Sequence, residues 1–322
     1  MSTAAAADAT LAERVQPLLD WVARQDQPVE LELVCAEHPD PARGAKGRFV
    51  VVLPVCAASL PEHVLYEVLV LGAELVWVRT DGCAEVEATG ARIAWMQSVL
   101  AAVGAGERLH AEAEPASQHR RRVLDATVMS VSRRRLLMLS ECDAAPEEGA
   151  SAHRRLVTTL RALAGAPSAA PGTPSELAGP GLALVSEGCT ACGVCVRACP
   201  EDALALVDVE ETGPDGAVIT RTILRQYPAA CGGAGACLQL CPEDALSAPE
   251  HWGLDALLED DVVDLDEIAK AVCRRCGATF PDSGAELCEL CSFRRANPFG
   301  GALPPAVAAR FGPELARRFE GR

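Results

Sequence analysis

The chain has 322 residues, 49% of them hydrophobic, and a formal net charge of −16 at pH 7. This length predicts about two domains, and the apolar share argues against a chain that is disordered throughout. The acidic balance argues against binding to nucleic acid or to an anionic membrane, because both require a cationic surface. No apolar run reaches the roughly 18–20 residues of a transmembrane helix, and residues 1–10 lack the basic segment of a signal peptide. We therefore expect a cytoplasmic protein with no transmembrane segment.

The first half of the chain alternates short apolar runs with helical patterns. Strands are predicted at 29–34, 48–53, 75–78 and 109–113, and helices at 10–25, 61–72 and 86–103. Strands and helices that alternate at this spacing predict an α/β domain with a mainly parallel sheet. We find no glycine-rich nucleotide-binding motif in this half.

The fifteen cysteines are unevenly spread, since eleven of them follow position 188. An odd number of cysteines in a chain without an export signal argues for metal ligation, redox chemistry or buried thiols rather than a disulfide scaffold. The four earlier cysteines are Cys35, Cys56, Cys83 and Cys142. The two halves of the chain therefore differ in chemistry.

The second half contains an internal repeat. The sequence CPEDAL occurs at 199–204 and again at 241–246, and Cys189 and Cys231 are separated by the same 42 residues. Two copies of one unit at a fixed offset predict a pseudo-symmetric module. Between the copies, Ala205–Val209 and Ala217–Ile223 flank the sequence GPDG and predict a β-hairpin.

The first copy is an iron–sulfur motif. Cys189, Cys192, Cys195 and Cys199, followed by Pro200, have the C-x2-C-x2-C-x3-C-P spacing that wraps a [4Fe–4S] cluster. The short gaps bring three thiolates and several backbone N–H groups onto the cluster, while the fourth cysteine turns away.

On these motifs, residues 182–250 resemble a bacterial two-cluster ferredoxin domain of the 7Fe or 8Fe type, which has an α+β fold. In that family the fourth cysteine of each motif binds the other cluster. The resemblance implies that Cys189, Cys192, Cys195 and Cys241 hold cluster one, a [4Fe–4S] cluster. It leaves Cys231, Cys237 and Cys199 for cluster two.

The second motif lacks one cysteine. Ala234 stands where the pattern has its second cysteine, and alanine offers no ligand atom. The family precedent for this loss is a [3Fe–4S] cluster. A [4Fe–4S] cluster with an exogenous ligand, or a site that binds nothing, are the alternatives.

A separate cysteine set follows near the C-terminus. Cys273, Cys276, Cys288 and Cys291 form CxxC-x11-CxxC, the spacing of two knuckles that place four thiolates tetrahedrally. We expect structural zinc in a small zinc-ribbon-like module. A rubredoxin-like iron and a third iron–sulfur cluster are the alternatives.

The N-terminal half has a resemblance of its own. The segment VVVLPVCAASLPEHVLYEVLVLGAELVWVRTDGC is similar to the delta subunit of methyl-viologen-reducing hydrogenases, whose cysteines hold a [2Fe–2S] cluster. Here those cysteines are reduced to Cys35, Cys56 and Cys83, which leaves either a cluster or free thiols. The order of parts along the chain also resembles the 4Fe-4S electron-transfer proteins that accompany bacterial formate dehydrogenases.

The predicted domain order is a tail at 1–10, an α/β domain with a basic C-terminal segment at 11–162, a Pro/Gly/Ala linker at 163–181, the dicluster ferredoxin domain at 182–250, and the metal-knuckle module with a tail at 251–322. Residues 181–270 hold 17 Asp and Glu against 4 Lys and Arg, either as a solvated face or as a surface that steers a basic redox partner.

These features predict an electron-transfer protein rather than an enzyme, because His38, His63, His110 and His119 belong to no recognisable catalytic set. We expect a relay subunit between a cytoplasmic dehydrogenase, of formate dehydrogenase or hydrogenase type, and a downstream acceptor. The alternative is an assembly or docking factor for a redox enzyme, in which the metal sites are structural.

Overall fold

A computed structural model describes residues 3–114, 119–129, 149–165, 177–212 and 218–298. Cys142, Arg133–Arg135 and most of the predicted linker lie outside these residues. The chain divides into two compact units. The first unit contains Met1–Ala178 and Gly253–Leu258, and the second contains Gly179–Trp252 and Glu259–Arg322.

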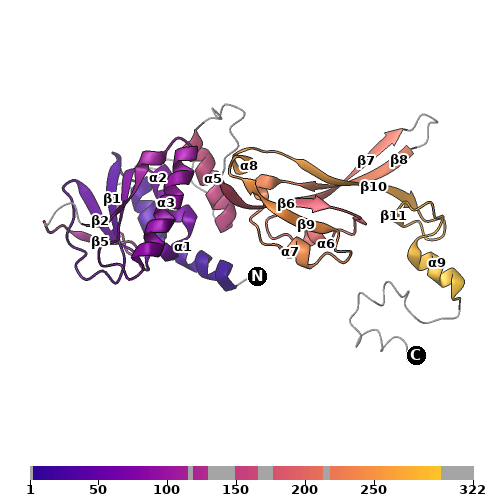
Figure 1. The fold of residues 1–322 in the computed structure, drawn as a ribbon, viewed down its shortest axis with the longest axis horizontal. Helices are drawn as coiled ribbons and strands as arrows, with labels where there is room; N and C mark the ends of the chain where they lie inside the picture. Colours follow the sequence, from indigo (N-terminus) through magenta and orange to yellow (C-terminus); the bar gives the residue numbers. More distant parts are fainter. Residues whose placement is uncertain (1–2, 115–118, 130–148, 166–176, 213–217, 299–322) are drawn as a thin grey trace, which may run out of the picture. The chain divides into compact units, whose positions relative to one another are not determined.

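The first unit is built on a five-stranded sheet in the order β4-β3-β1-β2-β5 (Figure 1). Each neighbouring pair is parallel, which confirms the predicted parallel α/β architecture. The strands are β1 (Val29–Val34), β2 (Arg48–Val52), β3 (Ala73–Arg79), β4 (Leu109–Glu112) and β5 (Val123–Asp125). The three-residue β5 was not predicted, because so short a run carries no periodicity.

Five helices belong to the described part of this unit. They are α1 (Thr3–Ala23), α2 (Glu62–Val70), α3 (Val86–Ala102), α5 (Ala152–Ala164) and α8 (Asp255–Leu258), with short 3-10 turns η1 (Ala57–Ser59) and η2 (Gly106–Arg108). Helix α1 begins inside the segment 1–10, which we expected to be a tail. The segment is rich in alanine, the residue with the highest helix propensity, and this favours the helix. At the start of α5, the Ser151 hydroxyl accepts a hydrogen bond from the Arg154 N–H at 3.1 Å.

The core of this unit centres on α2, which is buried along nearly its whole length and lies against α5. Burial includes the Glu67 carboxylate, which accepts two hydrogen bonds from Arg155 at 2.7 and 2.6 Å. Desolvation nevertheless raises the pKa of Glu67, because the favourable pairing with Arg155 only partly offsets it. Leu254 and Leu257, around α8, complete the same core.

His63 on α2 makes the first unit sensitive to acid. It is 3% exposed, and burial, with a smaller effect of the Arg155 cation, lowers its pKa to about 4. An unfolded histidine titrates near 6.5, so as the pH falls the unfolded chain takes up this proton first. The contribution of neutral His63 to the free energy of unfolding is therefore fully present above about pH 6.5 and is lost progressively as the pH falls towards 4.

We expect this group alone to lower the free energy of unfolding by about 2 kcal/mol between pH 7 and pH 5. Urea unfolding at pH 7 and pH 5, followed by tryptophan fluorescence, measures this difference in the free energy of unfolding. The comparison is His63→Leu, which has no titrating group at this position. The same loss in wild type and variant would contradict the assignment to His63.

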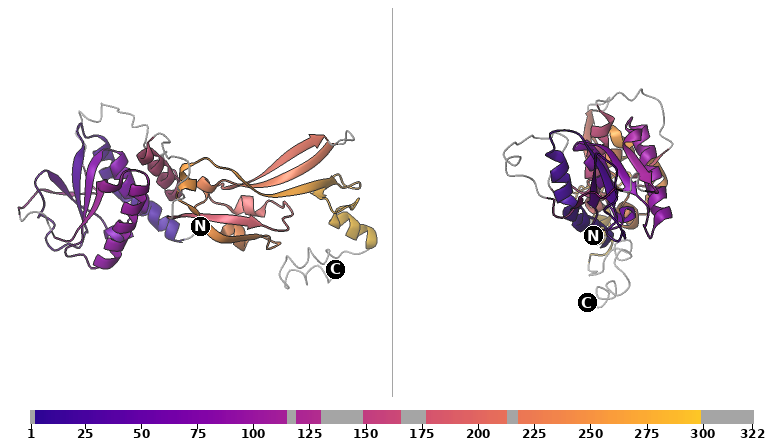
Figure 2. Two further views of the ribbon diagram at one scale, coloured as in Figure 1. Left: turned by 45° about the horizontal axis from the view of Figure 1, so that its top comes forward. Right: turned by 90° about the vertical axis from the view of Figure 1, so that its left-hand side faces the viewer.

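The second unit contains two sheets and several short helices (Figures 1 and 2). Strands β6 (Ala178–Ser186) and β9 (Leu246–Gly253) form a two-stranded sheet, and a four-stranded sheet has the order β11-β10-β8-β7. Its strands are β7 (Leu204–Thr212), β8 (Val218–Gln226), β10 (Val263–Val272) and β11 (Thr279–Pro281). Strands β7 and β8 pair antiparallel, with Leu204 opposite Gln226, which confirms the predicted hairpin.

The 42-residue repeat is visible in the backbone. Helices α6 (Val194–Ala198) and α7 (Ala236–Gln239) follow Gly193 and Gly235, which have left-handed φ values of 71° and 68°. The left-handed Asp202 and Asp244 of the two CPEDAL segments match in the same way, with φ values of 54° and 50°. A short turn, η3 (Pro228–Ala230), precedes the second motif, and α9 (Glu289–Ala296) ends the described region. None of the helices that the structure describes is long and apolar enough to span a bilayer.

Candidate metal centres

Cysteines from both repeat copies line one cavity in the second unit. Cys189, Cys192 and Cys195 come from the loop before and within α6, and Cys241 comes from the second CPEDAL segment. The apolar side chains of Leu206, Leu224 and Leu246 complete the wall. The structure thus brings together, around one cavity, the four residues that the resemblance implied for cluster one.

Backbone N–H groups point at these sulfurs. Cys189 Sγ accepts from the Ala191 N–H, and Cys241 Sγ from the Ala245 N–H, each at 3.3 Å. The Ala203 N–H donates to Cys199 Sγ at the same 3.3 Å, so the two CPEDAL segments present their cysteines identically. Such hydrogen bonds stabilise thiolate charge and help to set a cluster's reduction potential.

The three cysteines assigned to cluster two also lie near one another. Cys231 and Cys237 are buried, and the Leu182 N–H donates to Cys231 Sγ at 3.4 Å. Burial raises the pKa of Cys237, and the nearby charges of Cys231 and Cys199 raise it further. This second thiolate group repeats the arrangement around the first cavity, with one member from the other motif.

Ala234 lies at the exposed edge of the second motif. Its counterpart one repeat earlier is Cys192, which is likewise exposed. The missing ligand position therefore faces solvent rather than the protein interior, and no side chain of the second motif replaces it at this position of the repeat.

The C-terminal cysteines converge more tightly. The sulfurs of Cys273, Cys276, Cys288 and Cys291 all lie within 4.8 Å of one another, and Cys276 and Cys288 are 3.8 Å apart. Backbone N–H groups, chiefly that of Cys288, lower the pKa of Cys273 to about 6. Gly277 has a φ of +72°, which permits the tight turn after the second cysteine.

A third thiol group, which the sequence left open, occurs in the first unit. The sulfurs of Cys35, Cys56 and Cys83 are separated by 3.7, 3.9 and 3.6 Å. The Thr89 hydroxyl lies 3.6 Å from the sulfurs of both Cys56 and Cys83. No sequence signal pointed to Thr89, because a single threonine at the start of a helix is common.

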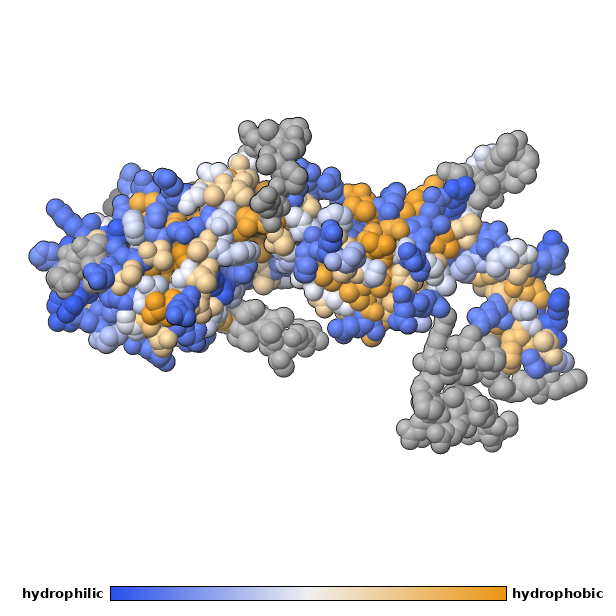
Figure 3. All heavy atoms as spheres, viewed as in Figure 1, coloured by the Kyte–Doolittle hydropathy of each residue, from blue (hydrophilic) through white to orange (hydrophobic). Residues whose placement is uncertain are grey.

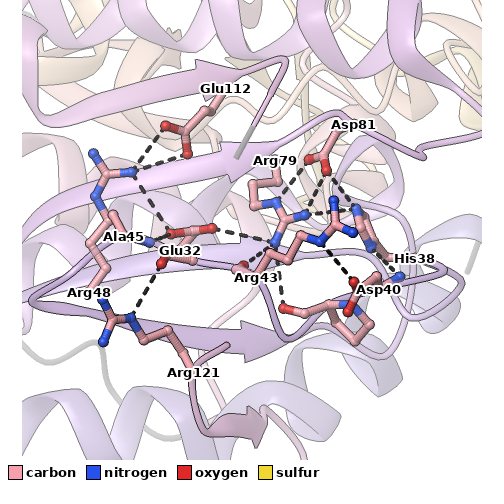
Figure 4. A network of polar contacts seen from close by, with 12 residues as sticks. Glu32, His38, Asp40, Arg43, Ala45, Arg48, Arg79, Asp81, Glu112 and Arg121 are labelled. Atoms are coloured by element: carbon pink, nitrogen blue, oxygen red, sulfur yellow. Dashed lines mark hydrogen bonds and ion pairs between the residues drawn. The ribbon is translucent and has the colours of Figure 1, made fainter. Parts of the chain in front are cut away.

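The first unit also contains a buried ionic network (Figure 4). The Arg79 side chain is fully buried and contacts the buried Glu32 at 3.4 Å and Asp81 at 2.6 Å. It also donates to the carbonyl of Arg43 at 2.5 Å, which ties the loop after β1 to the end of β3. Because Asp81 accepts from both Arg79 and His38, its pKa is lowered despite the cost of burial.

His38 completes this connection. Its Nδ1 accepts a hydrogen bond from the Asp40 N–H at 3.0 Å, which places the proton of the neutral ring on Nε2. Nε2 then donates to Asp81 at 3.0 Å. Of the four histidines considered from the sequence, His38 thus has a structural role in holding two loops together.

The surface of the second unit carries apolar residues among the hydrophilic ones (Figure 3). Leu240, between two cluster cysteines, is 57% exposed, and Val185 on β6 is 45% exposed. Both residues belong to the stretch 181–270, in which Asp and Glu outnumber Lys and Arg. A partly apolar surface with charged surroundings is typical of protein interaction sites.

Comparison with known proteins agrees with this geometry. Residues 188–250 match the family model described as a 4Fe-4S dicluster domain. A search of the curated proteins found no match to the chain. The second unit therefore contains a ferredoxin-type iron–sulfur domain, whose chemistry is electron transfer and whose work requires a redox partner. The remaining cysteine groups add metal-binding potential at two further places.

Proposed function

We propose that the protein is a relay subunit that passes single electrons between a dehydrogenase, of formate dehydrogenase or hydrogenase type, and a downstream acceptor protein in the cytoplasm. The match of residues 188–250 to a dicluster domain carries this proposal. The separate α/β unit supports a subunit rather than a free carrier, because a diffusible ferredoxin needs no such addition. The exposed Leu240 and the acidic excess support a docking surface close to the clusters.

In this proposal cluster one is a [4Fe–4S] cluster held by Cys189, Cys192, Cys195 and Cys241. Cluster two is a [3Fe–4S] cluster held by Cys231, Cys237 and Cys199. The common cavity lined by the first four cysteines supports the [4Fe–4S] assignment, and the exposed Ala234 in place of the second motif's second cysteine supports the [3Fe–4S] assignment. A zinc ion held by Cys273, Cys276, Cys288 and Cys291 stabilises the C-terminal module, supported by sulfurs that all lie within 4.8 Å.

A redox titration of the anaerobically purified chain tests the function. We expect two cluster signals, each reversible in one-electron steps, and reduction of both by a suitable dehydrogenase. Leu240→Gln should slow that reduction while leaving both potentials nearly unchanged, since it makes the exposed side chain polar without adding a charge or removing a ligand. Clusters without a reversible potential would favour the second candidate, an assembly or docking factor in which the metal sites are structural.

Ala234→Cys tests the assignment of cluster two. A thiolate at this position has the spacing that completes a four-iron cluster. We expect the oxidised wild type to show a three-iron EPR signal, which the variant loses as it gains about one iron per chain. Ala236→Cys, two residues away and outside the motif spacing, is the control and should leave the signal unchanged. A wild type with two four-iron clusters would instead mean that an outside ligand occupies the exposed position.

A further inference from the structure

The sheet order makes β1 a topological switch point. The chain passes from β1 to β2 on one side and then returns to β3 on the other side, so the strand order is β3-β1-β2. In open parallel sheets, ligands bind outside the carboxyl ends of the strands at such a point. Cys35 directly follows β1, Cys56 follows β2 after a short loop, and Cys83 follows β3 in the same way. All three thiols thus belong to the crevice where this fold places its ligands.

The spacing of the sulfurs distinguishes between kinds of metal centre. Four ligands arranged tetrahedrally at the zinc–sulfur distance of about 2.3 Å have sulfurs about 3.8 Å apart. The sulfurs of Cys35, Cys56 and Cys83 form a triangle with sides of 3.6 to 3.9 Å, which is one face of such a tetrahedron. In a cluster of several irons, thiolates on different irons must lie farther apart than this.

The same chain provides an internal comparison. Among the residues that the structure describes, close sulfur groups of this kind occur at Cys35, Cys56 and Cys83 and at the C-terminal knuckles. The four cysteines around the cluster-one cavity form no such group. The N-terminal triangle therefore resembles the knuckles in spacing and differs from the ferredoxin-type site.

Each loop that carries a cysteine is held in place. Arg79 binds the loop after β1 through the Arg43 carbonyl, and Arg92 on α3 donates to the carbonyls of Ala58 and Leu60 in the loop after β2. In the loop after β3, a side chain on Gly82 would meet Pro39 at 2.8 Å, and its φ is +70°. The three sulfurs thus sit on restrained supports, which lowers the cost of ordering ligands around an ion.

Polar groups around the triangle complement thiolate charge. Backbone N–H groups of Ala57 and Glu85 donate to the sulfurs of Cys35 and Cys83. The Thr89 side chain is fully buried, although its neighbours on the first turn of α3 are exposed, and its hydroxyl lies within reach of Cys56 and Cys83 as a further donor. Hydrogen bonds of this kind orient metal-bound thiolates and tune their affinity.

We propose that Cys35, Cys56 and Cys83 bind a single thiophilic divalent metal ion, such as Zn²⁺, with Thr89 as a positioning residue and the fourth coordination position open. This differs from the [2Fe–2S] cluster that the resemblance of the N-terminal segment implies. Three protein ligands with an open position are the arrangement of zinc sites that bind an exchangeable ligand, whereas four-thiolate sites are closed. The site would be able to take a small anionic or thiol ligand.

Metal and acid-labile sulfide analysis of the full chain tests the proposal. Cys56→Ser should lose one metal ion per chain and no sulfide. Cys276→Ser is the matched control, since it removes a ligand of the other close group, and the double variant should show the sum of the two losses. Loss of two irons with two sulfides in Cys56→Ser would establish a [2Fe–2S] cluster instead, and an unchanged metal content would overturn the proposal.

A second measurement does not depend on the folding of a variant. The chelator-treated wild type is alkylated with and without added Zn²⁺, and each cysteine peptide is quantified by mass spectrometry. Zn²⁺ should protect the Cys35, Cys56 and Cys83 peptides together, and Thr89→Val should raise the Zn²⁺ concentration needed by about tenfold. No protection by Zn²⁺, or a disulfide between two of these cysteines in the isolated chain, would overturn the proposal.

Discussion

Cys241→Ala should destroy the cluster of the first motif, although Cys241 lies in the second. The reason is that Cys241 shares a cavity with Cys189, Cys192 and Cys195, so its loss removes one of the four thiolates proposed for cluster one. We expect loss of the [4Fe–4S] signal and of about four irons per chain, or conversion to a three-iron form with a loss of about one. EPR spectra of the oxidised and reduced protein, together with iron analysis, measure this result.

Cys199→Ala is the reciprocal variant. It should spare cluster one and remove cluster two, which has three proposed protein ligands and cannot lose another. The two variants are closely matched. Each removes a cysteine that precedes a proline and whose sulfur accepts a hydrogen bond from a backbone N–H at 3.3 Å. If each variant instead lost the cluster of its own motif, the crossed ligation would be wrong.

Arg79→Met should destabilise the first unit by about 3–5 kcal/mol. The substitution retains much of the apolar side-chain volume but leaves Glu32, which is 0% exposed, without its closest cation. Burial already raises the pKa of Glu32, so the uncompensated carboxylate becomes costly at neutral pH. Urea unfolding followed by tryptophan fluorescence measures the loss, because Trp21, Trp77 and Trp95 lie in this unit.

Two further variants distinguish a buried charge from general damage. Arg43→Met removes an exposed ion pair with Asp40 and should cost less than about 1 kcal/mol. Adding Glu32→Gln to Arg79→Met should recover part of the loss, since it removes the unpaired charge. No recovery in the double variant would contradict the electrostatic explanation.

Most of the α/β architecture could be predicted because short apolar or alternating runs mark its strands, and Pro61, Gly72 and Gly104 mark helix ends. Glu32 shows where the pattern misleads. Alternating Glu and apolar residues are typical of a strand with one exposed face, yet both faces of a parallel sheet are covered, and Glu32 is buried against Arg79. Helix α5 lies in the basic C-terminal segment of the domain, where no helix was predicted, and its Leu156 and Leu160 are buried in the core.

The candidate metal centres also differ in how far the sequence could predict them, because some depend on local spacing and others on long-range contacts. Regular cysteine spacing within one loop predicts a site locally, as for Cys273 and Cys276 in the C-terminal knuckles. Cys35, Cys56 and Cys83 meet only because β2 and β3 flank β1, and this long-range strand order cannot be read from spacing. Thr89 joins them through the placement of α3, which depends on tertiary packing.

The six residues Gly253–Leu258 have a consequence for how the protein is made. They follow the dicluster segment in the chain but belong to the first unit, where Leu254 and Leu257 are buried in the core. During synthesis the first unit therefore stays incomplete until residue 258 has left the ribosome, by which point both cysteine motifs, which precede it in the chain, have also emerged. A fragment ending at residue 178 would leave an apolar hollow beside Leu160, and the remaining piece would expose α8. Completion of the α/β unit thus comes after synthesis of the segment that carries the proposed cluster ligands.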